Sequence, residues 1–185
     1  MAPVTCAGLR VAVRHSAESD APYAIRYANS AEIPEIVDKF FGDGDSAEIG
    51  VRADFSVTDA PEFVFVTYGN ITAKVIEAQK KLVQEGKTVG IILTEILKPI
   101  DDPVKEIAKY LTGVKKVLFV EEGILNGGFG MICASKLREE YPKFSNVKFG
   151  VSAIDDNFAT LSTEADPYDS IGLSADKLYD KIISL

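Results

Sequence analysis

The chain has 185 residues, 46% of them hydrophobic and 26% charged, so it is long enough to bury a core of its own. Its net charge of -8 argues against a nucleic-acid partner, because phosphate contacts need clustered Lys and Arg side chains. No run of the sequence approaches the roughly 20 apolar residues of a membrane span, and no signal-peptide pattern is present, so we expect a cytoplasmic protein without a membrane partner.

Two cysteines, Cys6 and Cys133, lie far apart in helical patterns. We therefore expect two free thiols in a reduced compartment. A nucleophile pair of either cysteine with His15, the only histidine, is an alternative, but no known signature surrounds either cysteine. His15 is expected at the surface.

The first part of the chain predicts a helix, a strand and an irregular connection. Residues 5–17 carry apolar side chains at helical spacing, and these are Cys6, Leu9, Val13 and Ala17. Residues 23–27 are expected to form a strand. Residues 28–46, which contain Pro34 and the cluster Gly42-Asp43-Gly44-Asp45, are expected to form an irregular connection.

The rest of the chain alternates strand and helix patterns. The predicted strands cover residues 47–55, 63–66, 89–93, 117–120 and 147–151. Helical patterns follow the last four strands, beginning near Ile71, at the capping residue Asp102, after the glycines at 127–130 and at Ser174. This order predicts a three-layer α/β domain, in which strands joined by helices run parallel through right-handed crossovers.

The segment 117–130 is the most informative. Its apolar run stops at Glu121-Glu122-Gly123, and Gly127, Gly128 and Gly130 then open a helical pattern that includes Phe129. Working groups of parallel α/β proteins lie at the carboxyl ends of strands, so this segment predicts a functional edge.

Two interpretations are open for Glu121 and Glu122. They can provide an acid or a base at a strand end, or contact another subunit. Alternatively, one is solvated and the other accepts backbone N–H bonds at the adjacent helix start. No nucleophile or metal set is completed nearby, so we expect no catalytic residue and no metal ligand in this chain.

The glycine-rich turn also has two interpretations. A turn of this kind before a helix can bind phosphate. However, it has neither the Lys-Ser/Thr pair of a P-loop nor the spacing of a dinucleotide fingerprint. Close packing of strand and helix, or close approach of another chain, is therefore favoured for Gly127, Gly128 and Gly130.

This segment resembles the last domain of 1-deoxyxylulose-5-phosphate synthase and its transketolase-like relatives, in which a similar acidic pair precedes a glycine-rich turn. Three further stretches resemble motifs of that family in the same order, and they are Pro22–Tyr27, Ile96–Asp101, and Gly150-Val151 followed by residues 171–175. The resemblance covers nearly the whole chain. It implies a five-stranded mixed sheet with one antiparallel edge strand, sandwiched between helices.

The resemblance also implies a domain division and a ligand contact. Residues 1–30 would be the remnant of a preceding pyrimidine-binding domain, and residues 46–185 the C-terminal domain. Arg26 matches an arginine that helps to hold the sugar phosphate in the family. The chain departs from the family where Asn29 replaces an arginine, and where Glu95 replaces a second phosphate-binding arginine.

The implied function is that of a C-terminal, structural or dimerisation part of a thiamine-diphosphate-dependent transferase that is not active alone. Thiamine diphosphate and magnesium belong to the complete enzyme, and none is expected to bind this chain, because Gly42-Asp43-Gly44 lacks the asparagines that complete a diphosphate motif and is read as a turn. The expected partner is a second copy or the missing thiamine-binding domains. Truncation at Met1 is favoured over a natural start.

Two other functions remain open. The chain could be a stand-alone α/β module that binds an anion or a partner. It could also be the C-terminal domain of a 2-oxoacid dehydrogenase β-subunit, although Glu121-Glu122-Gly123 argues against this. In the leading interpretation, the edge that contacts the partner or the active site consists of Glu121, Glu122, Gly123, Gly127, Gly128, Phe129 and Gly130.

Overall fold

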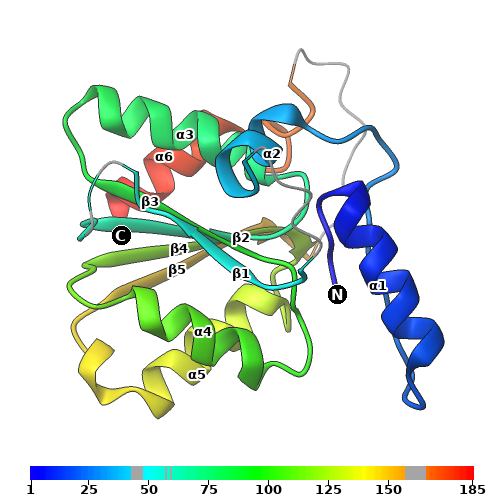
Figure 1. The fold of residues 1–185 in the computed structure, drawn as a ribbon. Helices are drawn as coiled ribbons and strands as arrows, with labels where there is room; N and C mark the ends of the chain where they lie inside the picture. Colours follow the sequence, from blue (N-terminus) through cyan, green and yellow to red (C-terminus); the bar gives the residue numbers. More distant parts are fainter. Residues whose placement is uncertain (43–47, 57, 59, 157–165) are drawn as a thin grey trace.

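The computed structural model describes residues 1–42, 48–56, 58, 60–156 and 166–185 (Figure 1). Of the cluster Gly42-Asp43-Gly44-Asp45 that was interpreted as a turn, all but Gly42 lies outside these described residues.

The described part of the chain forms a five-stranded sheet with the order β1-β3-β2-β4-β5. Its strands are β1 (Val51–Asp54), β2 (Phe63–Thr67), β3 (Val89–Thr94), β4 (Lys116–Ile124) and β5 (Lys148–Ile154). Strand β1 runs antiparallel to β3 at one edge, and the remaining neighbours pair in parallel. The expected mixed sheet with an antiparallel edge strand is thereby confirmed.

Helices cover both faces of this sheet (Figure 1). One face carries α2 (Pro34–Phe40), α3 (Thr72–Gln84) and α6 (Ala175–Ser184), and the other carries α4 (Asp101–Tyr110) and α5 (Phe129–Glu140), which is followed by the 3-10 helix η1 (Pro142–Phe144). The three layers predicted from the sequence are therefore present.

The central strand β2 shows how the core is divided. All five of its residues are buried. Because side chains of a strand alternate between faces, Phe63 and Phe65 pack in the cluster with α3 and α6, whereas Val64 and Val66 pack in the cluster with α4 and α5. A strand buried on both faces explains the unbroken apolar run in the sequence.

The predicted strand at residues 23–27 is wrong. This segment is not part of any strand and is joined to the first residue of the chain by two backbone bonds, from Met1 N to Ala24 O (2.8 Å) and from Arg26 N to Met1 O (2.9 Å). Residues 23–27 have the residue pattern of a strand, but they lack the ladder of backbone hydrogen bonds that would make them one.

The irregular connection predicted for residues 28–46 contains the helix α2. Pro34 lies in its first turn, where the missing N–H of proline breaks no helical bond, so this proline starts a helix instead of interrupting one. The buried Ile36 of α2 joins the core cluster. Asp54 at the end of β1 is buried and forms an ion pair with Lys39 of α2 at 2.7 Å.

Helix α1 (Cys6–Glu18) is present, but its predicted apolar stripe does not face the domain. Gly8 and Ala12 are its buried residues, whereas Val13 is 52% exposed. The helix approaches the domain closely at Gly8, where an added Cβ would lie 3.3 Å from a carboxylate oxygen of Glu95. Small residues therefore determine the buried face.

Two helix starts differ in detail from the prediction. Helix α4 begins at Asp101 with Ile100 at the N-cap, so Asp102 lies in its first turn and does not cap it. Ser174 is the N-cap residue of α6, but its hydroxyl donates to Asp169 at 2.7 Å and not to the helix.

Strand β4 extends beyond the point where the sequence pattern ended it. Its regular pairing with β5 runs to Val120, and a register shift separates Val120 from Ile124. Glu121 and Glu122 therefore lie in the irregular last part of a strand and not in the turn after it.

Among the described residues, no helix combines the length and the apolar character that crossing a membrane requires.

Candidate functional site

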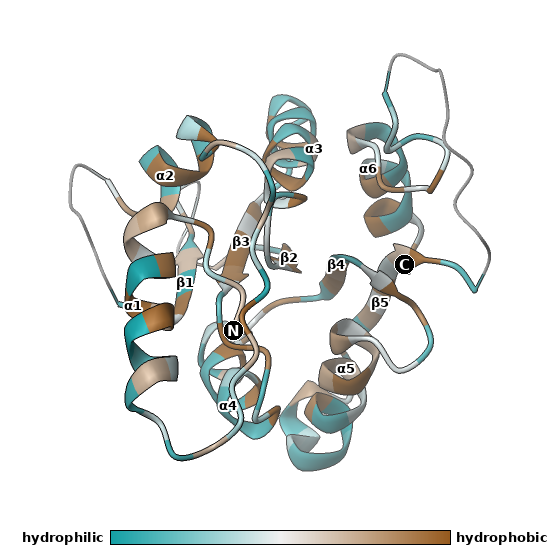
Figure 2. Cartoon of the chain, turned by 90° about the vertical axis from the view of Figure 1, so that its right-hand side faces the viewer, coloured by the Kyte–Doolittle hydropathy of each residue, from teal (hydrophilic) through white to brown (hydrophobic). Residues whose placement is uncertain are grey.

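A pocket of about 450 Å³ lies at the carboxyl edge of the parallel strands, and we call it the edge pocket. Figure 2 shows this edge, with the N-terminal segment running across it. Its polar lining comes from four parts of the chain and includes Arg26 of the N-terminal segment, Tyr68 and Asn70 after β2, Glu122 of β4, and Tyr168. The structure therefore joins Arg26 and Glu122, which were predicted separately.

Arg26 is held at the pocket by two contacts. Its Nη2 donates a hydrogen bond to the backbone carbonyl of Glu122 at 3.1 Å, and its guanidinium carbon lies 5.7 Å from the centre of the Tyr68 ring. Its side chain is otherwise exposed.

Tyr68 links the pocket to the interior. Its ring is buried and packs edge-to-face against Phe129 at 5.6 Å, and its hydroxyl donates to Glu121 Oε2 at 2.9 Å. Burial and the neighbouring Glu121 carboxylate both raise the pKa of the Tyr68 hydroxyl well above its ordinary value. Tyr68 is therefore a neutral hydrogen-bond donor at neutral pH.

Glu121 is a buried carboxylate with several donors. It is 2% exposed and accepts backbone N–H bonds from Phe129 (3.2 Å) and Gly130 (2.8 Å) in addition to the Tyr68 bond. Phe129 and Gly130 open helix α5, whose first N–H groups have no partner within the helix. For Glu121, this geometry agrees with the interpretation that one glutamate accepts backbone N–H bonds at the adjacent helix start.

The glycines of the turn make room for this carboxylate. A Cβ on Gly128 would lie 2.3 Å from the carbonyl oxygen of Ile124 and 2.7 Å from Glu121 Oε1, and a Cβ on Gly123 would lie 2.7 Å from Glu121 Oε2. Gly127 has a φ of +76°, which favours glycine. Close packing accounts for Gly123, Gly128 and Gly130, whereas an added Cβ on Gly127 would meet no atom within 4 Å, so its backbone conformation accounts for that glycine. Glu121 accepts two of the N–H groups that a phosphate would need.

Glu122 has a different environment. Its carboxylate accepts the hydroxyl of Tyr168 at 2.9 Å, and burial together with this carboxylate raises the pKa of Tyr168 to about 12. Lys74 lies 5.9 Å from the centre of the Tyr168 ring and pairs with Asp166 at 3.1 Å.

Glu95 does not line the edge pocket. It is fully buried and pairs with Arg52 at 2.7 Å, and burial raises its pKa although Arg52 opposes the shift. Its carboxylate also accepts the N–H of Val4 at 3.2 Å, and its carbonyl accepts the N–H of Ala2 at 2.7 Å. Glu95 thus fastens the first residues of the chain, to which the segment with Arg26 is bonded.

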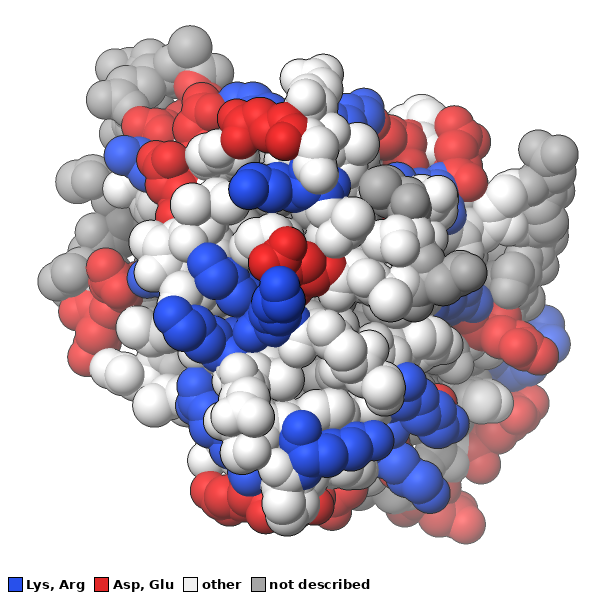
Figure 3. All heavy atoms as spheres, turned by 90° about the vertical axis from the view of Figure 1, so that its left-hand side faces the viewer, with Lys and Arg blue, Asp and Glu red and all other residues white. Residues whose placement is uncertain are grey.

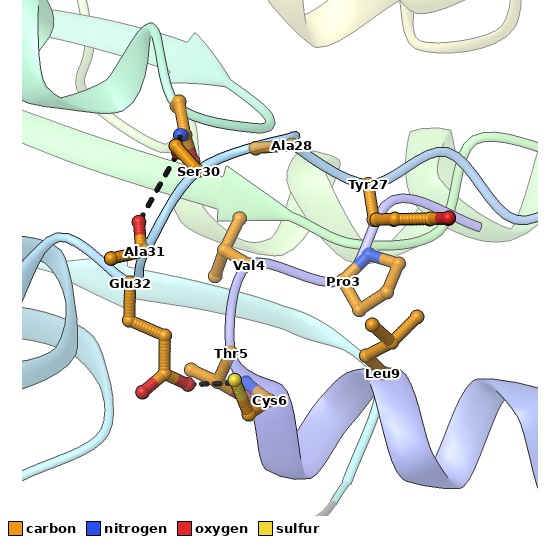
Figure 4. A pocket seen from close by; sticks show the side chains of 11 residues that line it. Pro3, Val4, Thr5, Cys6, Leu9, Tyr27, Ala28, Ser30, Ala31 and Glu32 are labelled. Atoms are coloured by element: carbon orange, nitrogen blue, oxygen red, sulfur yellow. Dashed lines mark hydrogen bonds between the residues drawn. The ribbon is translucent and has the colours of Figure 1, made fainter.

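A smaller hollow of about 60 Å³ adjoins the edge pocket, between the start of α1 and residues 27–32 (Figure 4). Cys6 lines it, and the backbone N–H of Cys6 donates to a carboxylate oxygen of Glu32. Asn70 reaches it from the other side and donates to Ser30 Oγ at 2.9 Å. This hydrogen bond links the loop after β2 to the N-terminal segment.

The two cysteines have no part in the edge pocket. Cys6 is an exposed free thiol and Cys133 a buried one. His15 is exposed on α1, as expected. Within the same residues no group of three or more His, Cys, Asp or Glu side chains is placed to hold a metal ion.

Basic side chains gather on the opposite, amino edge of the sheet, which Figure 3 shows. Lys115 and Lys148 are exposed there, at the starts of β4 and β5. The edge pocket, in contrast, has Arg26 as the single cation among the described residues that line it.

Tyr68, Asn70 and Tyr168 are among the pocket residues that were not predicted. Tyr68 and Asn70 directly follow the buried strand β2, so the rule that functional groups lie at carboxyl ends of strands was a sufficient signal for them. Tyr168 lies 46 residues from its partner Glu122, and no local pattern indicates that contact.

The family model described as "Transketolase, C-terminal domain" matches residues 55–177. A 1-deoxy-D-xylulose-5-phosphate synthase of Chlorobium phaeovibrioides is 30% identical over 163 residues, which are 88% of this chain and 24% of that protein. The synthase of Anaeromyxobacter dehalogenans is 27% identical over 185 residues, covering 96% of this chain and 27% of that protein. The chain spans about a quarter of the length of these curated relatives.

Solved structures agree with the fold. A structure described as "Split gene transketolase, inactive beta4 tetramer" superposes with a TM-score of 0.75 at 26% identity, covering 99% of this chain and 55% of that one. The transketolase of Campylobacter jejuni gives a TM-score of 0.51 at 17% identity over 74% of this chain and 18% of that one, which supports the fold alone.

Proposed function

Because the chain belongs to the transketolase C-terminal domain family, we propose that it acts as the C-terminal domain or subunit of a thiamine-diphosphate-dependent transferase similar to 1-deoxyxylulose-5-phosphate synthase. The observation that carries this proposal is the family match over residues 55–177, which takes in four of the five strands, the helices α3, α4 and α5, and the start of α6. The chain is inactive on its own in this proposal.

The chemistry of such an enzyme belongs to its cofactor and to other domains. Thiamine diphosphate supplies carbanion stabilisation when it is bound with magnesium elsewhere in the complete enzyme. The residues of this chain are proposed to close one side of the active site. Arg26 at the edge pocket is the proposed substrate contact, since a guanidinium is exposed there beside polar side chains.

The domain division of the chain is also part of the proposal. Residues 1–30 would be the end of a pyrimidine-binding domain, and residues 46–185 the complete C-terminal domain. The N-terminal segment is nevertheless bonded closely to the second part, through Glu95 and Ala2 and through Arg26 and Glu122. The two parts would therefore form the pocket together.

The glycine-rich edge is proposed as the contact with a second copy of the chain. Three apolar side chains beside it are exposed, namely Ile124 (60%), Met131 (46%) and Ile132 (38%). Glu122, Gly123, Gly127, Gly128 and Phe129 lie on this edge, whereas the buried Glu121 and Gly130 support it from inside. The structural neighbour described as a β4 tetramer supports self-association for a chain of this kind.

A reconstitution experiment tests the proposal. The coding sequence next to that of this chain is expected to encode a thiamine-binding part, and its product is purified separately. Two-carbon transfer with thiamine diphosphate and magnesium is expected in the mixture and in neither protein alone. Activity of this chain alone, or a mixture that neither associates nor reacts, would contradict the proposal.

A further inference from the structure

We propose that the edge pocket binds an uncharged polyhydroxylated chain, such as the unphosphorylated end of a sugar, and discriminates against a phosphate group. This proposal rests on the proposed function in one respect, since it treats the edge pocket as a substrate site. It goes beyond that function by naming what the pocket accepts.

The charge of the pocket is the first argument. Among the described residues, its lining contains one cation, Arg26, and one carboxylate, Glu122, so their charges offset each other. One N–H group of Arg26 is already used by the carbonyl of Glu122. A phosphate dianion would therefore meet a single, partly occupied guanidinium and a nearby negative charge.

Two basic side chains near the pocket are already paired, which is the second argument. Lys74, the basic residue beside Tyr168, forms ion pairs with Asp166 at 3.1 Å and with Glu77 at 3.3 Å. Arg52 is paired with the buried Glu95 at 2.7 Å, away from the lining of the pocket. No second positive charge is thus available to the pocket from these neighbours.

The uncharged groups of the pocket fit hydroxyl-bearing ligands. The lining combines the amides of Asn29 and Asn70 and the hydroxyl of Ser30 with the aromatic side chains of Tyr27, Tyr68 and Tyr168. Asn70 donates one N–H to Ser30, which leaves its second N–H and its carbonyl oxygen for a ligand. Amides and hydroxyls both donate and accept hydrogen bonds, as sugar hydroxyls do, and tyrosine rings pack against C–H groups. The volume of about 450 Å³ is within the range of about 300–1,000 Å³ that is common for small-molecule pockets.

The test uses the full chain, labelled with ¹⁵N, and compares titrations with xylitol and with inorganic phosphate at constant ionic strength by NMR. Xylitol is expected to cause saturable shifts of the Asn70 side-chain amide and the Arg26 guanidinium signals, and phosphate is not. Asn70→Ala is expected to weaken xylitol binding by about fivefold, as the loss of one hydrogen bond predicts. Asn146→Ala, at an exposed asparagine on the far edge of the sheet, is the matched control and should leave the titration unchanged.

A second variant tests the charge argument. Glu122→Gln removes the carboxylate and is expected to make the pocket accept phosphate, with saturable shifts at Arg26. Saturable phosphate binding by the unmodified pocket, or no saturable shift with xylitol, would overturn the proposal. Because these titrations need no partner and no cofactor, a chain that fails them and still reconstitutes transferase activity refutes only the ligand assignment, whereas failed reconstitution refutes the proposed function.

Discussion

The hydroxyl of Tyr68 donates a hydrogen bond to the carboxylate of Glu121 at 2.9 Å, and this bond joins the end of β2 to the end of β4 beneath the edge pocket. The same carboxylate receives the first N–H groups of α5. The ring of Tyr68 in turn makes a cation–π contact with the guanidinium of Arg26. The interior of the domain therefore positions the exposed arginine of the pocket through Glu121 and Tyr68.

Glu121→Gln should lower the free energy of unfolding by about 1.5–3 kcal/mol, because it removes a charged acceptor from three hydrogen bonds inside the domain. Urea unfolding monitored by circular dichroism measures this change. Glu122→Gln, at a partly exposed carboxylate with one tyrosine donor, is the matched control and should change stability by less. Equal effects of the two variants would show that Glu121 does not organise the turn.

Gly128→Ala should destabilise the fold by about 1–3 kcal/mol, since its Cβ would lie 2.3 Å from the backbone carbonyl of Ile124. Gly50→Ala is the control, because the nearest atom to its Cβ is a side-chain nitrogen of Arg52 at 4.0 Å. Thermal unfolding of both variants measures the difference. A Gly128→Ala variant as stable as the parent chain would mean that the turn is not closely packed.

Asp54 should stabilise the fold above about pH 4 and lose this effect in acid. Burial raises the pKa of Asp54, but hydrogen bonds from Lys39, Ser56 and Gln79 outweigh burial and hold it below its ordinary value. A lowered pKa in the folded state gives stability that is present above the unfolded-state pKa and falls as the pH drops through the folded-state pKa.

The measurement for Asp54 is the difference in unfolding free energy between the parent chain and Asp54→Asn over this acidic range. The difference should shrink as the pH falls. A difference that is constant with pH would contradict the lowered pKa.

Glu95 should behave in the opposite way. Burial raises its pKa, and the nearby Arg52 and the N–H groups of Val4 and Gly50 do not cancel this effect. A raised pKa in the folded state means that the stabilising contribution is present below the unfolded-state pKa and is lost as the pH rises through the folded-state pKa. The unfolding free energy of the parent chain relative to Glu95→Gln should therefore decrease as the pH rises, and an increase over the same interval would contradict the account.

Ile124→Asp combined with Met131→Asp should weaken self-association, because charged side chains would then have to be buried at the proposed contact. Sedimentation velocity measures the oligomer directly. Val13→Asp, on the exposed side of α1, is the matched control. If Val13→Asp weakens self-association and the double variant does not, the contact lies on α1 and the glycine-rich edge has another role.

The central part of the fold could be predicted from the sequence, because β2 and β3 are continuous apolar runs buried on both faces, and such runs have few alternatives. Helix α2 could not, since it has only seven residues and begins at a proline that usually indicates a turn. The orientation of α1 could not be predicted either, because the domain packs against Gly8 and Ala12 and not against the larger apolar residues of that helix.

The candidate site shows the same limit. Arg26, Glu121 and Glu122 were identified from their places after strands or in a familiar pattern. Their partners Tyr68 and Tyr168 come from distant segments, and a hydrogen bond over 46 or 53 residues is set by the tertiary fold and not by local spacing.

The most direct test of the central claim, that this chain is one part of a thiamine-dependent transferase, is titration calorimetry with thiamine diphosphate and magnesium. We predict no binding in the micromolar range to the chain alone. When this chain is added to the thiamine-binding part, we expect transferase activity to appear while the number of cofactor molecules bound by that part stays the same. Micromolar binding of the cofactor to the isolated chain would contradict it.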